Sequence, residues 1–442
     1  MATATSAPPA NIGKYRIERE LGRGASGIVY LGLDGFRGRK VAIKQTHAHL
    51  LKVPEQAERY RKLLRNEAAL SGRLRHPNIV RLLDADEEAL PPYLVLEYVD
   101  GQPLSDFATP DTLLPVPQVL DIAFKCCNAL EYAYREGLVH RDIKPANLML
   151  AHGGDVKLTD FGAALSLRSD ATQLSGLVGS PSYMSPEQVR EQDLTHHSDM
   201  FSLAVVVYEL LTGRRPFDGD TDFATLYKIS NETPTRPSLL RASLPAHVDE
   251  VLLRALAKQP ADRFATWADF AQALLAAHRG LPRQKSQDTE AERFARLRAL
   301  PFFSDFHDVA LWELMRLGSW RRLEQGTVLM RENTPGDSFC ILIEGQVAVS
   351  RQGWNLSTLG PGVTLGEMPY LRPDNRIRTA TAVAETEVLV LKVRNPALRE
   401  ASEDLQSRFD KAFIKLLVGR LIATNEQLAE WELVAAPGPA GG

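Results

Sequence analysis

Two short polar motifs near the middle of the chain constrain its fold and chemistry more than any other feature. The first runs His140-Arg141-Asp142-Ile143-Lys144-Pro145-Ala146-Asn147, and the second, Asp160-Phe161-Gly162, begins thirteen positions after Asn147. Residue types at this spacing supply a carboxylate base, a lysine that neutralises negative charge and two oxygen ligands for a metal ion. Because these groups act together only when they meet in one cleft, the spacing predicts a folded domain around both motifs.

A glycine-rich hairpin is expected near the N-terminus. Gly22, Gly24 and Gly27 fall between two runs with strand-like alternation, and the second run ends Val41-Ala42-Ile43-Lys44. Glycines allow a hairpin backbone to approach phosphate groups without interference from a Cβ. The pattern alone also fits an ordinary hairpin, with Lys44 as an exposed surface cation. In combination with the two polar motifs it favours a site for nucleotide phosphates.

Lys44 needs an acidic partner if it is to hold phosphates in a fixed orientation. Residues 61–74 are predicted to form a helix, and Glu67 within it is the partner that we expect. Glu58 stays an alternative, because the helical phase of a single sequence does not exclude it. Residues 93–101 predict a strand followed by a turn, which is either an edge strand or a hinge whose backbone meets an adenine ring.

Over about residues 15–275 these motifs resemble the eukaryotic-type serine/threonine protein kinases of bacterial style. The resemblance implies that Asp142 accepts the proton of a substrate hydroxyl or orients that hydroxyl for attack. Lys144, which is typical of serine/threonine rather than tyrosine kinases, is implied to neutralise the γ-phosphate of ATP. Asn147 and Asp160 are implied to hold Mg²⁺, whose charge offsets the negative charge of the transferring group.

The resemblance also implies where ATP binds. The glycine hairpin covers the phosphates, the hinge meets the adenine, and apolar side chains border the ring above and below. Every position that the family needs for catalysis is filled, which argues against a degenerate and inactive relative. The implied ATP contacts are Gly22, Gly24, Gly27, Val29, Ala42, Lys44, Glu67, Leu96, Glu97, Val99 and Met149.

An activation loop is implied between the second polar motif and Glu187. Residues 179–187 resemble the end of such a loop that receives the protein substrate, with Ser180 where the family usually has threonine. Arg141 is implied to bind a phosphorylated residue of the loop through charge-assisted hydrogen bonds. The candidate phosphorylation sites are Ser166, Ser169, Thr172 and Ser175, of which Thr172 and Ser175 are the best placed.

Two further acidic residues are implied to support the helical part of the kinase fold. Glu187 is expected to form a buried ion pair with Arg263, which would hold that part together. Asp199 is expected to brace the backbone of the catalytic loop. Neither role involves contact with a substrate.

The pattern changes after about residue 301 to short β-type runs separated by turns, followed by an amphipathic helix. Residues 298–425 resemble a cyclic-nucleotide-binding domain. The resemblance implies a β-roll in which a short helix opens after Gly366 and receives a cyclic phosphate at its N-terminus. The implied ligand contacts are Gly366, Glu367 to the ribose, Arg378 to the phosphate, and Thr379, which favours cyclic GMP over cyclic AMP. The predicted strands are 327–331, 339–343, 346–350, 379–384 and 387–392.

Pro369 departs from the pattern of this second family. It stands where family members offer a backbone N–H to the phosphate, and proline has none. A lost hydrogen bond to a charged group costs about 1.5–3 kcal/mol, or roughly one to two decades in affinity. Pro373 and Asp374 also lengthen and acidify the approach to Arg378. Three interpretations stay open: binding of a cyclic nucleotide, binding of another small ligand, or a ligand-free β-roll in which Glu367 and Arg378 pair with each other.

Composition narrows the remaining possibilities. The 442 residues are 44% hydrophobic and carry a formal net charge of -3, which favours folded cores and argues against a general nucleic-acid or membrane-surface binder. The three cysteines, two of them adjacent at Cys126-Cys127, form no disulfide or metal-binding pattern, so a cytoplasmic location is expected. We expect neither a signal peptide nor an apolar run long enough to span a membrane.

We therefore expect an α+β multidomain chain. It would comprise a disordered leader (1–12), a bilobal protein kinase fold (13–279), a linker (280–296), a β-roll cyclic-nucleotide-binding-like domain with a C-terminal helix (297–425) and a flexible tail (426–442). The expected function is ATP- and Mg²⁺-dependent phosphorylation of serine and threonine in a protein substrate, regulated through the β-roll. Two alternatives stay open: a constitutive kinase whose β-roll only docks or forms a homodimer, and a non-catalytic, nucleotide-sensing scaffold.

Overall fold

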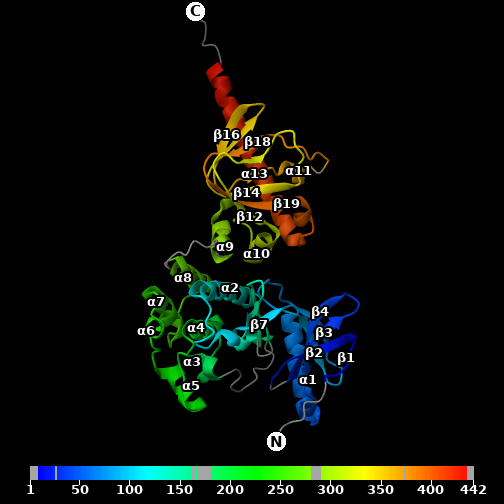
Figure 1. The fold of residues 1–442 in the computed structure, drawn as a ribbon, viewed down its shortest axis with the longest axis vertical. Coiled ribbons are helices and arrows are strands. Elements are labelled where there is room, and N and C mark those ends of the chain that lie inside the picture. The colour runs from blue at the N-terminus through cyan, green and yellow to red at the C-terminus, as the bar shows by residue number, and fades with distance from the viewer. Residues whose placement is uncertain are drawn as a thin grey trace, which may run out of the picture. The chain divides into compact units, whose positions relative to one another are not determined.

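The computed structural model describes residues 8–24, 27–161, 165–166, 181–279, 290–372 and 374–435. The chain divides into two compact units, Met1–Gln287 and Asp288–Gly442 (Figure 1). The boundary falls within the segment that the sequence predicts as a linker. Among the helices described, none is long and apolar enough to cross a membrane.

An antiparallel sheet and one helix form the N-terminal part of the first unit. In sheet order the strands are β1 (Asn11–Ile12), β2 (Tyr15–Arg23), β3 (Gly27–Asp34), β4 (Arg39–Thr46), β6 (Tyr93–Glu97) and β5 (Leu82–Asp86). Val41, Ile43 and Val95 are fully buried on one face of the central strands, where β-branched side chains pack well. Helix α1 (Pro54–Ser71) packs against β5 and β6 and carries one of the acidic candidates for Lys44.

The sheet extends into the segment predicted as a disordered leader. Asn11 and Ile12 form β1 and pair with Arg16 and Tyr15. Ile12 is 4% exposed and belongs to the core of the sheet. The structure therefore differs from the prediction at these two residues, because burial of the Ile12 side chain stabilises a strand that polar flanking residues concealed in the sequence.

Helices build the C-terminal part of the first unit. Helices α2 and α4 are apolar around most of their circumference and are accordingly buried along most of their length. The helices are α2 (Val116–Arg135), α3 (Pro186–Val189), α4 (His196–Thr212), α5 (Asp222–Asn231), α6 (Pro237–Leu240), α7 (Ala246–Ala255) and α8 (Trp267–Arg279). The packing of α2 against α4 and α8 provides the rigid base on which the polar motifs lie.

Five short strands position the two polar motifs. The first motif connects β8 (Leu138–Val139) to β9 (Leu148–Ala151), and the second follows β10 (Val156–Leu158). Strand β9 pairs with β10 and with β7 (Gly101–Pro103), while β8 pairs with β11 (Leu165–Ser166). The first motif leads into β9 and the second follows β10. Because β9 and β10 pair with each other, the two motifs lie next to each other.

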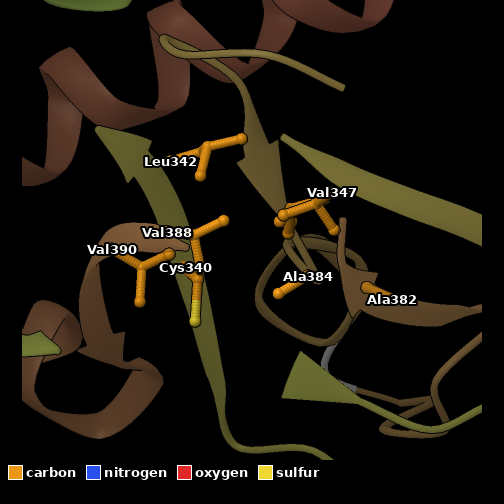
Figure 2. Close-up of a cluster of buried hydrophobic side chains, with 8 residues drawn as sticks. Cys340, Leu342, Val347, Ala382, Ala384, Val388 and Val390 are labelled. Carbon is orange, nitrogen blue, oxygen red and sulfur yellow. The ribbon is translucent and has the colours of Figure 1, made fainter. Parts of the chain in front are cut away.

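The second unit is a roll made of two antiparallel sheets. One sheet has the order β12 (Ser319–Leu323), β19 (Val388–Arg394), β14 (Ser338–Glu344) and β17 (Thr364–Leu365). The other has the order β13 (Val328–Met330), β18 (Thr381–Ala384), β15 (Val347–Arg351) and β16 (Trp354–Leu359). Their shared core includes Cys340, Leu342, Val347, Val388 and Val390 (Figure 2).

All five strands predicted for this unit are present with shifted ends. The structure adds β12, β16 and β17, which the sequence does not predict. Strand β16 is exposed at nearly every position, and β12 at most positions. An exposed strand lacks the apolar alternation on which sequence-based prediction of strands depends.

Helices close one side of the roll. An aromatic cluster joins the last helix to the rest, with Phe409 and Phe413 fully buried and Phe339 of β14 packed against both at 5.7 and 5.4 Å between ring centroids. The helices are α9 (Glu290–Ala299), α10 (Asp308–Leu317), α11 (Met368–Leu371), α12 (Asn395–Arg399) and α13 (Glu403–Ala435).

Two predicted boundaries of the second unit need correction. The last part of the predicted linker, from Glu290, belongs to α9, where Phe294 is buried and stacks on Trp312 at 4.8 Å. The predicted flexible tail begins at residue 426, yet α13 continues to Ala435. Residues 426–435 are mostly strong helix formers without glycine or proline, which favours continuation of the helix.

Candidate active site

The backbone of the first polar motif is held by Asp199 in the first turn of α4. The main-chain N–H groups of His140 and Arg141 donate to the Asp199 carboxylate at 2.7 and 2.8 Å. Arg141 has a φ of 70°, a left-handed conformation that non-glycine residues rarely adopt. Burial raises the pKa of Asp199 above its usual value, although the two N–H donors act in the opposite direction. The carboxylate thus fixes a strained turn immediately before Asp142.

Two polar side chains of the same motif converge on the Asp142 carboxylate. Lys144 Nζ donates to Asp142 Oδ2 at 2.7 Å, and Asn147 Nδ2 donates to the same oxygen at 3.1 Å and to the Asp142 main-chain oxygen at 2.8 Å. The Asp142 side chain is 14% exposed, so the carboxylate is both oriented and accessible. A carboxylate held in this way can accept a proton from a hydroxyl that lies within hydrogen-bond distance of it.

Lys44 joins the sheet part of the first unit to the second polar motif. Its Nζ donates to Glu67 Oε1 and Oε2 at 3.0 and 3.1 Å and to Asp160 Oδ1 at 2.7 Å. Burial acts to lower the pKa of Lys44, but the two carboxylates hold it above its ordinary value. Lys44 is therefore a fixed cation between two anions.

The alternative partner of Lys44, Glu58, does not reach it. Glu58 is exposed on α1, nine residues before Glu67. At about 100° per residue, nine residues amount to two and a half helical turns, so the two glutamates lie on opposite sides of the helix. The structure brings Lys44 and Glu67 together, as expected, and leaves Glu58 outside the cluster.

The second motif packs on the first. Phe161 is 3% exposed and lies 4.6 Å from the His140 ring, and His140 Nε2 is 3.1 Å from the main-chain oxygen of Thr159. Asp160 has a φ of 62°, which turns the chain directly after the packed strand. Gly162 lies outside the described residues.

The donor set of Asn147 and Asp160 suits a hard divalent cation. Mg²⁺ prefers carboxylate and amide oxygens. The amide nitrogen of Asn147 faces Asp142, so its amide oxygen is the atom that Asn147 offers to a metal ion. Asp160 adds a carboxylate whose side chain is 41% exposed. The residues present therefore fit the metal that the sequence implies.

The glycine hairpin closes the sheet side of the site. Gly24 N donates to Gly27 O at 2.9 Å, and a Cβ on Gly27 would lie 2.2 Å from the main-chain oxygen of Gln45. Only glycine fits there without displacement of the backbone. Val29 of β3 pairs with Gly22 of β2 on one side and with Lys44 of β4 on the other.

The remaining predicted ATP contacts are partly exposed. Ala42 is opposite Leu96 in the pairing of β4 with β6, and both side chains are partly exposed. Val99 and Met149 are also partly exposed. Glu97 differs, because its carboxylate pairs with Lys157 at 2.8 Å and its main-chain N–H donates to the Arg81 main-chain oxygen at 2.8 Å. Nothing in the sequence indicates this pairing, since the two residues are 60 positions apart.

A buried ion pair lies behind the site. Arg263 donates to the two oxygens of Glu187 at 2.7 and 2.8 Å, and the side chains are 0% and 3% exposed. Burial disfavours the charged form of Glu187, but hydrogen bonds from Arg263 and Ser198 hold its pKa below the usual value. The predicted partners are thus in contact.

The Arg141 side chain is half-buried, and its Nε has no hydrogen-bond partner among the described residues. Burial lowers the pKa of this guanidinium. Gln188 Nε2 donates to the Arg141 main-chain oxygen at 2.9 Å, a support that sequence reasoning missed. Thr172 and Ser175, the preferred phosphorylation candidates, lie outside the described residues, as do Ser169 and Ser180.

Arg378 is the centre of the site predicted in the β-roll. It is 8% exposed, and its Nη1 and Nη2 donate to the main-chain oxygens of Gly366 and Ser338 at 2.7 and 2.5 Å. Glu367 is 3% exposed, whereas Thr379 is exposed. Pro369 is buried in the first turn of α11. The structure thus brings three of the four predicted residues together and leaves the Thr379 side chain at the surface.

Comparison with known proteins identifies both units. The family model for the protein kinase domain matches residues 15–276, and that for the cyclic nucleotide-binding domain matches residues 320–404. The chain therefore belongs to the protein kinase family, and part of its second unit matches the cyclic nucleotide-binding domain model. The resemblances and the fold class inferred from the sequence are confirmed.

Similar curated proteins are named serine/threonine-protein kinase PknB. That of Mycolicibacterium smegmatis is 37% identical over 296 residues, which are 65% of this chain and 47% of the relative. That of Mycobacterium leprae is 37% identical over 293 residues, covering 65% and 46%, and that of Mycobacterium tuberculosis is 36% identical over 288 residues, covering 63% and 45%. The chain spans about half the length of these relatives.

Proposed function

We propose that the first unit transfers the γ-phosphoryl group of ATP to serine and threonine hydroxyls of a protein substrate. One observation carries this proposal: the Lys44–Glu67–Asp160 cluster and the Asp142–Lys144–Asn147 set are both assembled. Phosphoryl transfer requires mainly positioning and charge stabilisation, and these two groups supply both. The serine/threonine class rests on Lys144 and on the names of the relatives.

Each residue of the site has a distinct part in this proposal. Lys44, fixed by Glu67, holds the α- and β-phosphates. Asp142 accepts the hydroxyl proton, and Lys144 neutralises charge on the γ-phosphate. Bound Mg²⁺ would supply additional charge neutralisation at the phosphates, with Asn147 and Asp160 as its protein ligands.

We also propose that phosphorylation of the segment after Asp160 activates the kinase. Support comes from the Arg141 guanidinium, which is half-buried and has an Nε without a partner among the described residues. A phosphate group offers the acceptor oxygens that such a donor needs. Thr172 and Ser175 stay the preferred candidates.

The catalytic proposal is tested with the full chain, radiolabelled ATP, Mg²⁺ and casein as a generic acceptor. Wild type should label itself or casein on serine and threonine, and Asp142→Asn should lose at least about two decades in rate, as expected for loss of a general base. Asp193→Asn, which removes an exposed carboxylate with no catalytic assignment, is the matched control. Equal labelling of wild type and Asp142→Asn would refute the role of Asp142, and absence of labelling would favour the scaffold alternative.

A second proposal is that a cyclic nucleotide binds the β-roll and regulates the kinase. The family match over residues 320–404 and the convergence of Arg378, Gly366 and Glu367 support it. Pro369 weakens this proposal, because proline has no backbone N–H to donate a hydrogen bond to the cyclic phosphate. Cyclic AMP and cyclic GMP should each be tested by thermal shift and by kinase rate. Arg378→Ala should abolish the shift, while Arg376→Ala, which alters an exposed neighbour, should preserve it.

We further propose a homodimer formed through α13. Its middle section exposes Ile414, Leu417, Val418, Leu421 and Ile422, a spacing of three and four residues that places them on one stripe. A second copy of the helix offers the complementary apolar stripe. Sedimentation of the full chain should show a dimer that Leu421→Glu dissociates; a wild-type monomer at all concentrations would exclude this interface.

The compartment that we propose is the cytoplasm. All three cysteines, Cys126, Cys127 and Cys340, are free and buried. Proteins with free thiols and no disulfide framework are typical of reducing compartments.

A further inference from the structure

The second unit contains a cavity of about 410 Å³. Strands β12, β14 and β19 form one wall, and β13 with the segment from Thr334 to Asp337 forms the other. Among the residues assigned to the cyclic nucleotide, only Arg378 lines this cavity; Gly366, Glu367 and Thr379 do not. The cavity therefore shares one arginine with the predicted nucleotide site and differs from it in its other lining residues.

Two glycines pack against the Arg378 guanidinium. A Cβ on Gly336 would lie 2.1 Å from Arg378 Nε, and one on Gly366 would lie 2.2 Å from Nη1. The guanidinium is thus enclosed between two backbone segments and held by two carbonyl oxygens. Arg378 is therefore a fixed cation in the lining of the cavity.

The lining carries an excess of positive charge. Arg321, Lys392 and Arg378 contribute three cations and Asp337 contributes one carboxylate, which leaves the lining itself with a net charge of +2. The Glu367 carboxylate, outside the lining, also acts on Arg378. Asp337 already pairs with Arg394 at 3.3 Å. Within the part of the chain that the structure describes, no carboxylate lies within ion-pair distance of Arg321 or Lys392.

Strand pairing places these cations on the same side of the sheet. Arg321 is opposite Val390 in the pairing of β12 with β19, and Lys392 is opposite Cys340 in the pairing of β19 with β14. Positions 390 and 392 are two apart on one strand, so they face the same side. Cys340 and Val390 extend from neighbouring strands into the interior of the roll (Figure 2).

All three cations act electrostatically on the Cys340 thiol. Burial raises the pKa of Cys340, whereas Lys392, Arg378 and Arg321 act to lower it. Arg322, the next residue of β12, instead pairs with Glu387 at 2.9 Å and with Glu344 at 3.8 Å. It is absent from the cavity lining and provides a natural comparison with Arg321.

We propose that this cavity binds a small phosphomonoester with an apolar organic part. A phosphomonoester carries about −1.5 to −2 charges at pH 7, which matches the net charge of the lining, and guanidinium groups bind phosphate oxygens in a bidentate manner. A cyclic nucleotide is a phosphodiester with a single negative charge and matches less well. Leu323, Leu329 and Met330 supply apolar wall for the organic part, and the volume is in the range of small-ligand sites.

Calorimetric titration of the full chain with phenyl phosphate tests the proposal. Arg321→Gln and Lys392→Gln should each weaken binding by about tenfold, since each removes a charge-assisted contact, and the double variant should weaken it further. Arg322→Gln, which removes an equal charge from the opposite face of β12, should leave the affinity unchanged. Both substitutions at the site affect solvent-accessible side chains, and circular dichroism verifies that each variant is folded.

Three further titrants distinguish the possible outcomes. Inorganic phosphate should bind more weakly than phenyl phosphate, because it lacks the apolar part, and neutral benzyl alcohol should not bind. Cyclic GMP should be insensitive to Arg321→Gln. Absence of phenyl phosphate binding, or equal affinity in wild type and the double variant, would overturn the proposal. Equal affinity for phenyl phosphate and inorganic phosphate would overturn the assignment of an organic ligand.

Discussion

The buried pair of Glu187 and Arg263 allows a quantitative prediction. Arg263 is fully buried and donates to Glu187, to the main-chain oxygens of His197 and Ala257, and to that of Lys258. Replacement of Arg263 by methionine leaves the Glu187 carboxylate buried with Ser198 as a remaining side-chain donor. Loss of one partner of a buried ion pair destabilises a protein by about 3–5 kcal/mol.

Hydrogen exchange measured by mass spectrometry on peptides of α4 is the appropriate assay, because the two units need not unfold together. Amides that exchange through unfolding of the first unit should exchange about two to three and a half decades faster in Arg263→Met. The double variant Glu187→Gln/Arg263→Met should recover part of the loss, since no buried charge is left without its partner. Arg135→Met breaks an exposed pair with Glu131 at i,i+4 and should cost only about 0.3–0.5 kcal/mol.

The same pair predicts a pH dependence. The folded-state pKa of Glu187 lies below its ordinary value of 4.5, so its contribution to stability is complete above about pH 4.5 and is lost as the pH falls through the folded-state pKa. Glu187→Gln should remove this part of the acid sensitivity. If Arg263→Met exchanges no faster than Arg135→Met, or if the double variant is less stable than Arg263→Met, the proposed cost of an unpaired buried charge is refuted.

Three other substitutions probe the site and the roll. Glu67→Gln should lower kcat/KM for ATP by about ten- to a hundredfold through loss of a charged hydrogen bond to Lys44, while Glu58→Gln should leave it unchanged; equal effects would contradict the pairing. Gly27→Ala would place a Cβ 2.2 Å from a main-chain oxygen and should raise KM for ATP, whereas Gly35→Ala, which faces open space, should not. Phe413→Ala should destabilise the second unit by about 3–5 kcal/mol, which calorimetry would detect as a lowered transition; an unchanged transition would show that the aromatic cluster contributes little.

The catalytic part of the site was predictable because its residues are close together in sequence. Asp142, Lys144 and Asn147 lie within one loop, so their spacing alone determines that they meet. Glu67 could be preferred over Glu58 but not assigned, since one helix presents both, and only the packing of α1 against the sheet decides which side faces Lys44.

The parts that sequence did not reveal depend on long-range pairing. Arg321 and Lys392 are 71 positions apart, and each alone is an ordinary cation on a strand; the pairing of β12 with β19 brings them to one cavity. The N-terminal boundary of the second unit also depends on contacts that the sequence does not show, and α9 begins at Glu290 rather than after residue 296. The segment from Glu290 is polar by composition, and the burial of Phe294 against Trp312 makes it a packed helix.

The Lys44 cluster has a consequence for the choice of nucleotide. Lys44 and Lys144 face Glu67, Asp142 and Asp160, two positive against three negative groups, so these five side chains sum to −1. A bare triphosphate is repelled by a field of its own sign. The same residues attract a divalent cation, and the sum becomes +1 once one is present. If the chain binds ATP as proposed, these five side chains would favour the nucleotide as a metal complex over the free anion.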